Sequence, residues 1–518
     1  MSLFVKKPID KLILEADDTE KGLKRTLGAG NLIALGIGAI IGAGLFVRTA
    51  AAAAQNAGPA VTIGFIVAAI GCALAGLCYA EFASMIPIAG SAYTYSYATM
   101  GEFVAWIIGW DLVLEYAIGA ATVGIAWSEY FNKLLGIFGT GVPYEWSHSP
   151  FEKMVDHDTK QVLATGIMNV PALFIILLLT LLLIRGTKGS AMVNAFIVIL
   201  KVAIVIVVIA IGWSYIRPEN HTPFIPEPSA YVDSQGVKHN FGGILGILGA
   251  AGVVFFAFIG FDAVSTAAQE AKNPKKDMPI GILGSLVICT ILYILFSYVL
   301  TGIASVEVFR TVGKEASVSY AVEHMAGDTV NGVWVAKYQW LSNLITVAIL
   351  AGFSSVILVM LMGQSRVFYS MSRDGLVPKV FSEVHPKHRT PYKSNWIFFL
   401  FVGAFAAFIP GDIVGDMTSI GTLFAFMLVC AGVWILRVKS PHIKRQFKTP
   451  LVPLIPILGI IVCGAMIFGL GWTNWARLGV WLLLGFVIYF GYSRTHSKLQ
   501  HGRMLKPKDP VDPYNPKK

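Results

Sequence analysis

The chain has 518 residues, of which 55% are hydrophobic and 14% are charged, and its mean hydropathy is +0.67. A water-soluble protein of this length could not bury so much apolar surface in one core, so lipid must form part of its solvent. The net charge of +10 would suit nucleic acid in a soluble protein. In a membrane protein it instead reports orientation, and we expect no nucleic-acid partner.

Apolar runs of roughly 20 residues, the length of a transmembrane helix, recur about twelve times along the chain. We therefore predict an all-α integral membrane protein with about twelve transmembrane helices. A cytoplasmic tail at 1–28 precedes one transporter domain at 29–492, and a second cytoplasmic tail follows at 493–518. The predicted spans lie near 29–52, 60–87, 101–131, 164–185, 191–215, 243–270, 278–302, 336–371, 394–409, 416–436, 454–470 and 474–492.

The N-terminal tail lacks the apolar run and cleavage site of a secretory signal, so we expect the first span to be retained. If that tail is cytoplasmic, Lys and Arg are more concentrated in the inner connections than in the outer ones. The positive-inside rule then predicts twelve spans with both termini in the cytoplasm. We expect this multi-pass protein to lie in the plasma membrane. Asn220 begins a glycosylation sequon in a predicted outer loop, but such a triplet is common by chance.

The residue types that most often hold metals or perform catalysis are not clustered in this sequence. All five cysteines fall inside apolar runs without a CxxC spacing, and the ten histidines lie in connections and tails without an HxxxH pair. A membrane enzyme would need a grouped acid, base or metal set. We expect no enzymatic activity, no metal and no cofactor.

Two spans, five apart, contain sequences that disfavour a continuous helix. Span 1 has four glycines within 35–46, and span 6 ends its aromatic stretch 255–261 with Asp262. Transporters built from inverted repeats place their substrate at discontinuous helices in corresponding positions of the two halves. We expect 42–44 to be unwound, although Gly38 and Gly42 in a GxxxG spacing also suit close helix packing.

An amino acid carries a carboxylate and an ammonium, and the main-chain groups released at two helix breaks can bind both. Amides at the start of the second half of span 1 would bind the carboxylate, and carbonyls at the ends of the first halves would bind the ammonium. The predicted substrate-binding residues are Ile40, Ile41, Ala43, Gly44, Phe256, Ala257 and Ile259. The predicted gate or structural residues are Gly42, Phe258, Gly260 and Asp262, and Phe256 is also expected to close over the substrate.

Six motifs, at 23–28, 38–46, 87–93, 110–116, 255–279 and 366–375, together resemble those of the amino acid-polyamine-organocation (APC) superfamily. They are most similar to the cationic amino acid transporter branch, and the resemblance covers nearly the whole chain. It implies amino acid transport and a LeuT-like fold of two inverted five-helix repeats, at about 29–215 and 243–436, with extra helices at 454–492. Ala43 stands where the branch often has a hydroxyl residue, so carboxylate binding falls to the main-chain amides.

Lys201 lies in the middle of span 5, where a lysine costs about 2.5–3.5 kcal/mol on insertion scales. In proton-coupled members of the family, a lysine on span 5 replaces the cation that sodium-coupled relatives bind. Lys201 resembles that lysine. The resemblance therefore implies contacts with span-1 carbonyls near Gly38. A buried ammonium that can lose its proton offers a route to proton coupling, whereas a purely structural pair is the alternative.

Two predicted spans carry further acidic groups. Asp111 and Glu115 are four residues apart on span 3, where like charges repel unless one is protonated or paired. Glu115 either takes part in proton coupling or is a neutral carboxyl group that bonds a neighbouring helix. Asp262 follows the break in span 6 and is predicted to cap the second half of that span.

These features predict a secondary active transporter of L-amino acids, working by proton-coupled symport and alternating access, with substrate at the broken helices 1 and 6. The alternatives are a proton-independent amino acid exchanger and a sensor that binds substrate without transporting it. A channel would need a continuous polar pore, which the paired breaks argue against. The expected partners are an L-amino acid, protons and the lipid bilayer, and the sequence leaves open both an accessory subunit and the choice between cationic and small neutral substrates.

Overall fold

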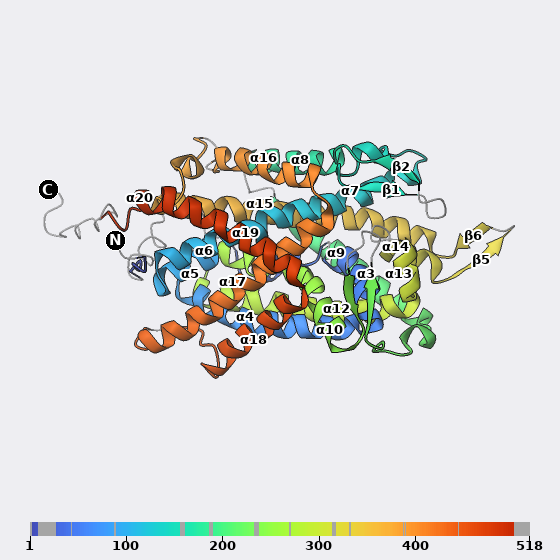
Figure 1. The fold of residues 1–518 in the computed structure, drawn as a ribbon, viewed down its shortest axis with the longest axis horizontal. Helices are drawn as coiled ribbons and strands as arrows, with labels where there is room; N and C mark the ends of the chain where they lie inside the picture. The colour runs from blue at the N-terminus through green and yellow to red at the C-terminus, as the bar shows by residue number, and fades with distance from the viewer. Residues whose placement is uncertain are drawn as a thin grey trace.

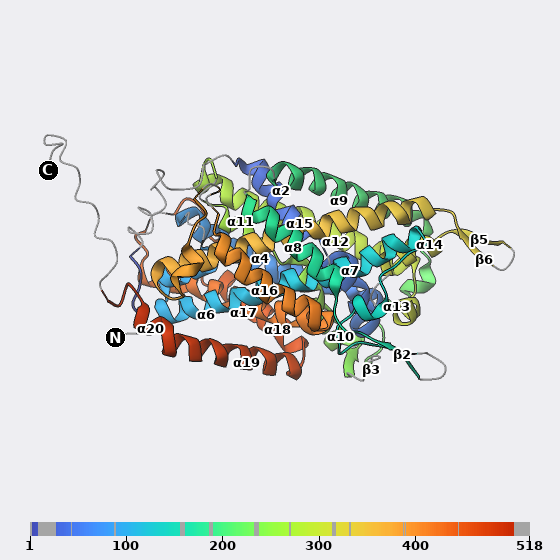
Figure 2. The same cartoon turned by 90° about the horizontal axis from the view of Figure 1, so that it is seen from above.

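The computed structural model is a bundle of helices that run side by side along the long axis of the molecule (Figures 1 and 2). The residues that the structure describes are 3–8, 27–42, 44–86, 90–155, 161–185, 190–232, 238–268, 271–312, 317–330, 333–386, 388, 390–443 and 445–501.

In the first half of the chain, two pairs of strands lie in connections between the long helices. Its helical elements are α2 (Ala29–Ile40), η1 (Gly44–Arg48), α3 (Thr49–Ala52), η2 (Ala53–Ala57), η3 (Gly58–Ala60), α4 (Val61–Met85), α5 (Ser91–Thr99), α6 (Glu102–Val113), η4 (Leu114–Ile118), α7 (Gly119–Ile137), η5 (Tyr144–Trp146), α8 (Val170–Arg185), α9 (Ser190–Gly212), η6 (Trp213–Tyr215) and η7 (Pro218–His221).

The second half repeats the alternation of long helices and short connecting elements. These are α10 (Gly243–Phe255), η8 (Phe256–Phe258), α11 (Ala263–Thr266), α12 (Pro274–Ile303), α13 (Val306–Val312), α14 (Ser317–His324), α15 (Gln339–Asp374), η10 (Lys379–Ser382), α16 (Tyr392–Phe408), α17 (Gly411–Lys439), α18 (Leu454–Gly469), α19 (Trp472–Ile488), η11 (Tyr489–Ser493) and α20 (Arg494–His496).

Within the described residues, eight helical segments are long and apolar enough to cross a membrane, and four shorter apolar helices accompany them. Each predicted span contains helix, and the protein is therefore a mostly helical, multi-span membrane protein. Several boundaries differ from the prediction. The span predicted at 164–185 begins in β2 (Val162–Thr165), with its helix starting at Val170, and the span predicted at 336–371 begins in β6 (Val333–Ala336), with its helix starting at Gln339. The expected connection at 53–59 is largely helical, and the chain turns there at Gly58, whose φ is 58°.

The outward faces of the bundle are apolar, as contact with lipid requires. Figure 2 shows α9 and α19 on opposite outer sides, and both carry exposed aliphatic side chains, such as Ile199 (70% exposed) and Val487 (72% exposed). In the interior, α12 packs against α2 and α4. Small residues permit this contact: a Cβ added at Gly36 would lie 2.4 Å from the Oγ of Ser285.

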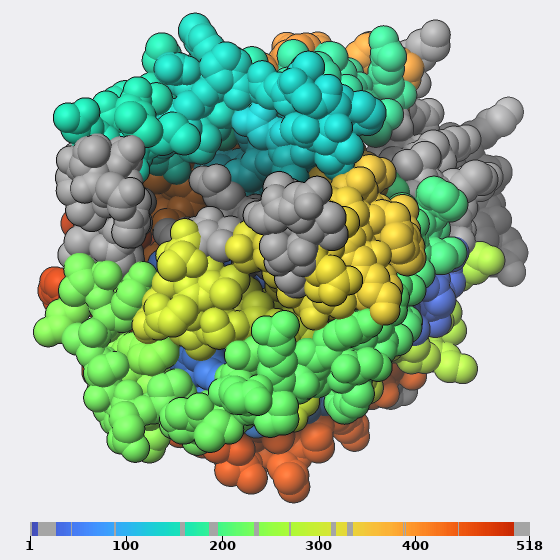
Figure 3. Space-filling model, turned by 90° about the vertical axis from the view of Figure 1, so that its right-hand side faces the viewer, coloured from blue at the N-terminus to red at the C-terminus, as the bar shows by residue number. Residues whose placement is uncertain are grey.

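Three antiparallel hairpins extend from connections between helices, pairing β1 (Lys153–Val155) with β2 (Val162–Thr165), β3 (Ser229–Val232) with β4 (Lys238–Phe241), and β5 (Gly327–Val330) with β6 (Val333–Ala336). They lie at the end of the molecule opposite both termini (Figures 1 and 2). Figure 3 looks at that end and shows teal, green and yellow segments, far apart in the sequence, forming one surface. The sequence predicted polar outer loops at two of these places but no strands.

Candidate functional site

The helix of span 1 is interrupted between α2 and η1. Ile41 has an extended backbone (φ −72°, ψ 106°), Gly42 forms a bend, and helical structure resumes at Gly44. The amide of Leu45 then donates to the carbonyl of Gly42 at 3.1 Å. Ala43, a predicted ligand of the substrate carboxylate, lies outside the described residues. The interruption falls where the glycines of span 1 predicted it.

Span 6 is interrupted in a similar way between α10 and α11. The chain tightens into the 3₁₀ turn η8, becomes extended at Ile259 (ψ 135°) and reverses at Gly260, whose φ is 109°. Helix resumes with Ala263. Because a backbone at φ 109° is accessible chiefly to glycine, Gly260 has a conformational role in the break.

The two interruptions touch each other at two glycines. A Cβ added at Gly44 would lie 2.1 Å from the Cα of Ala257, and one at Gly260 would lie 2.8 Å from the Cβ of Ala39. Both distances are shorter than an ordinary contact between carbon atoms. The absence of a side chain at Gly44 and at Gly260 therefore brings the two stretches of bare main chain together.

Tyr293, on α12, joins the two broken helices from a third element. Its hydroxyl lies 2.9 Å from the carbonyl oxygen of Ile40 and 2.9 Å from that of Ala257. A phenol has one hydrogen to donate, so the two carbonyls share it. Tyr293 is fully buried, and sequence reasoning missed it because a tyrosine within an apolar span gives no sign of what it contacts.

Lys201, on α9, reaches the break in span 1. Its Nζ donates to the carbonyl oxygens of Gly38 at 2.6 Å and Ile41 at 2.8 Å, and the residue is 1% exposed. These are the span-1 carbonyls that the family resemblance implied. Because α2 ends here, both carbonyls are at a helix terminus, where they lack the usual partner four residues on.

The profile of the family described as amino acid permease matches residues 27–490. The chain belongs to the amino acid permease family. It is 45% identical to the branched-chain amino acid permease BcaP of Bacillus subtilis (strain 168), over 96% of this chain and 99% of that protein. The methylthioribose transporter of the same organism is 40% identical over 96% and 99%, and the vacuolar cationic amino acid transporter 4 of Arabidopsis thaliana is 33% identical over 85% and 68%. This protein is accordingly a membrane permease and not an enzyme.

Three buried acidic residues, Asp111, Glu115 and Asp262, lie near the break in span 6. Asp262 makes no side-chain cap bond to α11, so the predicted capping role is wrong; its Oδ2 instead accepts a 2.6 Å hydrogen bond from the hydroxyl of Tyr116. Asp111 and Glu115 are fully buried, and the carboxyl oxygens of Asp111 have no hydrogen-bond partner within the described part of the chain. Glu115 lies within hydrogen-bonding reach of the carboxyl group of Asp262, a bond that needs a proton on one of the two groups. Glu115 lies in the π-helical turn η4, a distortion that is frequent at functional sites.

Several carbonyls that the sequence offered to a substrate ammonium have protein donors in this structure. Those of Ile40 and Ala257 accept from Tyr293, that of Ile41 accepts from Lys201, and that of Phe256 accepts from the amide of Ile259 at 3.3 Å. A substrate bound at these carbonyls would share them with, or displace, the protein donors.

The aromatic residues at the second break are buried. Phe258 packs against Tyr293 and Phe65, with ring centroids 5.2 Å and 6.2 Å apart, and is 0% exposed. Phe256, expected to gate the site, is 4% exposed. Phe258 thus belongs to the packing that supports the break.

Proposed function

We propose that this permease is a secondary active transporter that carries L-amino acids together with protons by alternating access, with the substrate bound between the two broken helices. The observation that carries the proposal is the ammonium of Lys201 on the carbonyls of Gly38 and Ile41. Lys201 can gain or lose a proton, and it directly contacts the broken end of the helix that we expect to bind the substrate.

The substrate's two charges find opposite partners at the breaks. From Gly44, helical structure runs without interruption to Ala57, so the amide of Gly44 stands at a positive helix terminus and suits a carboxylate. The carbonyls of Phe256, Ala257 and Ile259 are acceptors for the ammonium. Exposed main chain at mid-membrane is tolerated where it lines a cavity, as this arrangement would in an open state.

In this proposal, proton coupling arises because deprotonation of Lys201 weakens its hydrogen bonds to span 1. An ammonium donates to the carbonyls of Gly38 and Ile41 with a charge-assisted hydrogen bond to each, whereas a neutral amine binds both more weakly. Loss of the proton therefore loosens the inner half of span 1 from α9 and favours movement of that half. Glu115, which is buried beside Asp262 and can share a proton with it in a hydrogen bond, is our candidate for passing the proton on.

For the substrate we propose neutral, branched-chain L-amino acids. The support is the name of the 45% identical relative and the apolar, aromatic character of Phe256 beside the break. The 40% identical methylthioribose transporter makes a small thio sugar the second candidate. Cationic amino acids, which the name of the Arabidopsis relative suggests, form the third class to be compared.

We further propose that 29–215 and 243–436 are inverted repeats. We also propose that the protein lies in the plasma membrane with both termini in the cytoplasm. The support is that the two breaks occupy the first span of each proposed repeat. Reporter fusions at residues 28 and 501 would test the topology. Opposite locations of the two reporters would contradict an even number of spans.

The decisive experiment is uptake of radiolabelled substrate into proteoliposomes with the interior alkaline or at equal pH. We expect leucine uptake that rises with the proton gradient and is outcompeted by isoleucine and valine. Lys201→Met should abolish the dependence on the gradient, while Lys238→Met, at an exposed strand position, should leave it intact. Uptake that needs internal amino acid and ignores pH would establish an exchanger instead, and binding without uptake would establish a sensor.

A further inference from the structure

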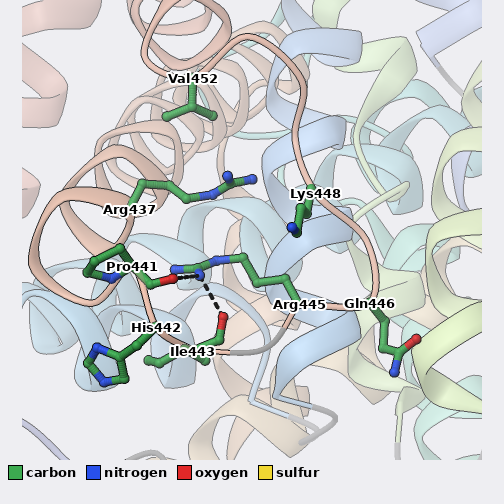
Figure 4. Close-up of a pocket in the computed structure, with 8 residues that line it drawn as sticks. All are labelled: Arg437, Pro441, His442, Ile443, Arg445, Gln446, Lys448 and Val452. Carbon is green, nitrogen blue, oxygen red and sulfur yellow. Dashed lines mark hydrogen bonds between the residues drawn. The ribbon is translucent and has the colours of Figure 1, made fainter.

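A basic hollow lies where α17 ends and the chain turns back toward α18 (Figure 4). It is a cavity of about 560 Å³, and the residues that determine its chemistry are Arg437, His442, Arg445, Gln446, Lys448 and Val452. Figure 1 shows this end of the bundle on the same side as the two termini. The transport mechanism proposed above uses none of these residues.

The positive charge of the hollow exceeds what the protein itself neutralises. Glu81 of α4 is 1% exposed and accepts from Arg437 at 2.8 Å through Nε and 2.8 Å through Nη2, and from the Nε of Arg445 at 2.9 Å. Two guanidinium groups thus share one carboxylate. Among the described residues, Lys448 has neither an ion pair nor a side-chain hydrogen bond, so its ammonium adds to this uncompensated charge.

The guanidinium groups are fixed in place. Arg445 also donates to the carbonyl oxygens of Ser440 at 3.0 Å, Pro441 at 3.2 Å and Ile443 at 2.7 Å, and the dashed lines of Figure 4 mark the last two. The side chain of Arg437 extends beside it. Because Arg445 donates to these three carbonyls and to Glu81 and its side chain is 3% exposed, it contributes its positive charge to the hollow rather than a free donor.

A second basic hollow, of about 710 Å³, adjoins the first and shares Gln446 with it. It lies at the start of α12, where Lys275 and Lys276 are exposed and make no ion pair within the described residues. Its lining also contains Asn273 and apolar residues that include Ile280 and Phe447. The two hollows therefore flank the 445–448 stretch with positive charge on both sides.

Apolar side chains continue from both rims along the membrane helices. Val438, Leu451 and Leu454 beside the first hollow are 69%, 71% and 50% exposed, and Ile280 in the second is 41% exposed. Val438 and Ile280 lie near the ends of membrane-length helices, and Leu451 and Leu454 lie just before and at the start of the shorter apolar helix α18. We expect the headgroup layer to meet the hydrocarbon at such helix ends. A ligand matched to this surface has an anionic head and apolar tails.

We propose that the two hollows bind the phosphate groups of anionic phospholipids, whose acyl chains follow the exposed apolar faces of α12, α17 and α18. Basic pockets at the membrane boundary attract anionic headgroups with about 1 kcal/mol for each lysine or arginine near the surface. A zwitterionic lipid brings a compensating cation into the same hollow and gains less. The site is therefore selective for net negative headgroups.

Native mass spectrometry of the purified full-length protein tests this with three probes: phosphatidylglycerol, phosphatidylcholine of the same chain length, and inorganic phosphate. We expect phosphatidylglycerol to bind at least about tenfold more tightly than phosphatidylcholine. Lys275→Gln and Lys448→Gln should each weaken phosphatidylglycerol binding by about fivefold, as expected for one surface charge.

Lys379→Gln, at an exposed basic residue that lines neither hollow, is the matched control and should change nothing. Both test residues are exposed. Equal affinity for the two lipids, or an equal loss in the control, would overturn the proposal. Displacement of the lipid by millimolar inorganic phosphate would overturn the lipid assignment in favour of a free anion.

Discussion

The contact between the two broken helices depends on the absence of one side chain, at Gly44. The Cβ of Gly44→Ala would lie 2.1 Å from the Cα of Ala257 and 2.5 Å from its backbone nitrogen, whereas an ordinary contact is 3.4 Å or more. The helices must therefore move apart by about 1.3 Å at this point, since a backbone cannot rotate away as a side chain can. That movement also disrupts the 2.9 Å bonds by which Tyr293 holds Ile40 and Ala257.

Overpacking of a dense interior costs about 1–3 kcal/mol, which corresponds to a loss of about five- to 150-fold in the population with both helices in contact. We expect leucine uptake by Gly44→Ala proteoliposomes to fall at least about tenfold. Gly479→Ala, on α19 with nothing within 4 Å of the new Cβ, should transport normally. Adding Ala257→Gly should not restore Gly44→Ala, because the nearest atoms belong to the backbone; uptake above half the wild-type rate in the single variant would refute the reasoning.

Three further predictions concern other contacts. Tyr293→Phe leaves two buried carbonyls without their donor, at a cost of about 1–3 kcal/mol, and should slow uptake and lower the melting temperature in detergent, although the ring keeps its packing. Glu81→Gln leaves two guanidinium groups without a carboxylate and should lower the melting temperature in detergent, with a cost of about 3 kcal/mol, whereas Glu219→Gln in an exposed turn should not. Burial lowers the pKa of His221 in the loop that contains η7, so the folded state favours the neutral ring. The stability of the protein should therefore fall as the pH drops below the usual histidine pKa of about 6.5. In denaturation curves, His221→Gln should reduce that pH dependence.

The spans and the location of both breaks could be predicted because they depend on local sequence. Hydropathy marks each helix that lipid surrounds, and glycine at 42, 44 and 260 marks backbone that a side chain would obstruct. Lys201 stood out because a charge in an apolar run needs a partner. Its partners, however, came only from the family resemblance, since no local pattern relates residue 201 to residue 38.

What the sequence did not show depends on contacts between distant segments. Tyr293 and Ile40 are 253 residues apart, and Tyr116 and Asp262 are 146 apart. Asp262 was taken for a helix cap because its sequence position fits one, but the tertiary partner Tyr116 competes for the same carboxylate. The three hairpins were missed because each strand has only three or four residues and lies in a polar loop, where alternation is too short to detect.

The C-terminal segment also makes contacts with parts of the chain that are distant in the sequence. It folds back onto the end of the bundle that also holds residues 3–8 (Figure 1). The amide of Lys498 donates to the carbonyl of Asp374 at 3.0 Å. A Cβ added at Gly375 would lie 2.4 Å from the carbonyl oxygen of His496, and the φ of Gly375 is 86°. The same Asp374 binds Lys7 from the N-terminal segment at 2.9 Å. Both ends of the described chain are thus tied to the end of α15.

Glu102, at the start of α6, is the polar centre of this attachment. It is 0% exposed and accepts from Tyr489 at 3.2 Å, from Gln500 at 2.6 Å and from the hydroxyl of Ser497. Glu102→Gln replaces one charged acceptor oxygen by an amide donor, and hydrogen bonds to a charged group contribute about 1.5–3 kcal/mol each. The segment should therefore detach at least about tenfold more often. Trypsin cleavage after Lys498, followed by mass spectrometry, measures the detachment; an unchanged cleavage rate relative to Glu219→Gln would show that Glu102 does not hold the segment.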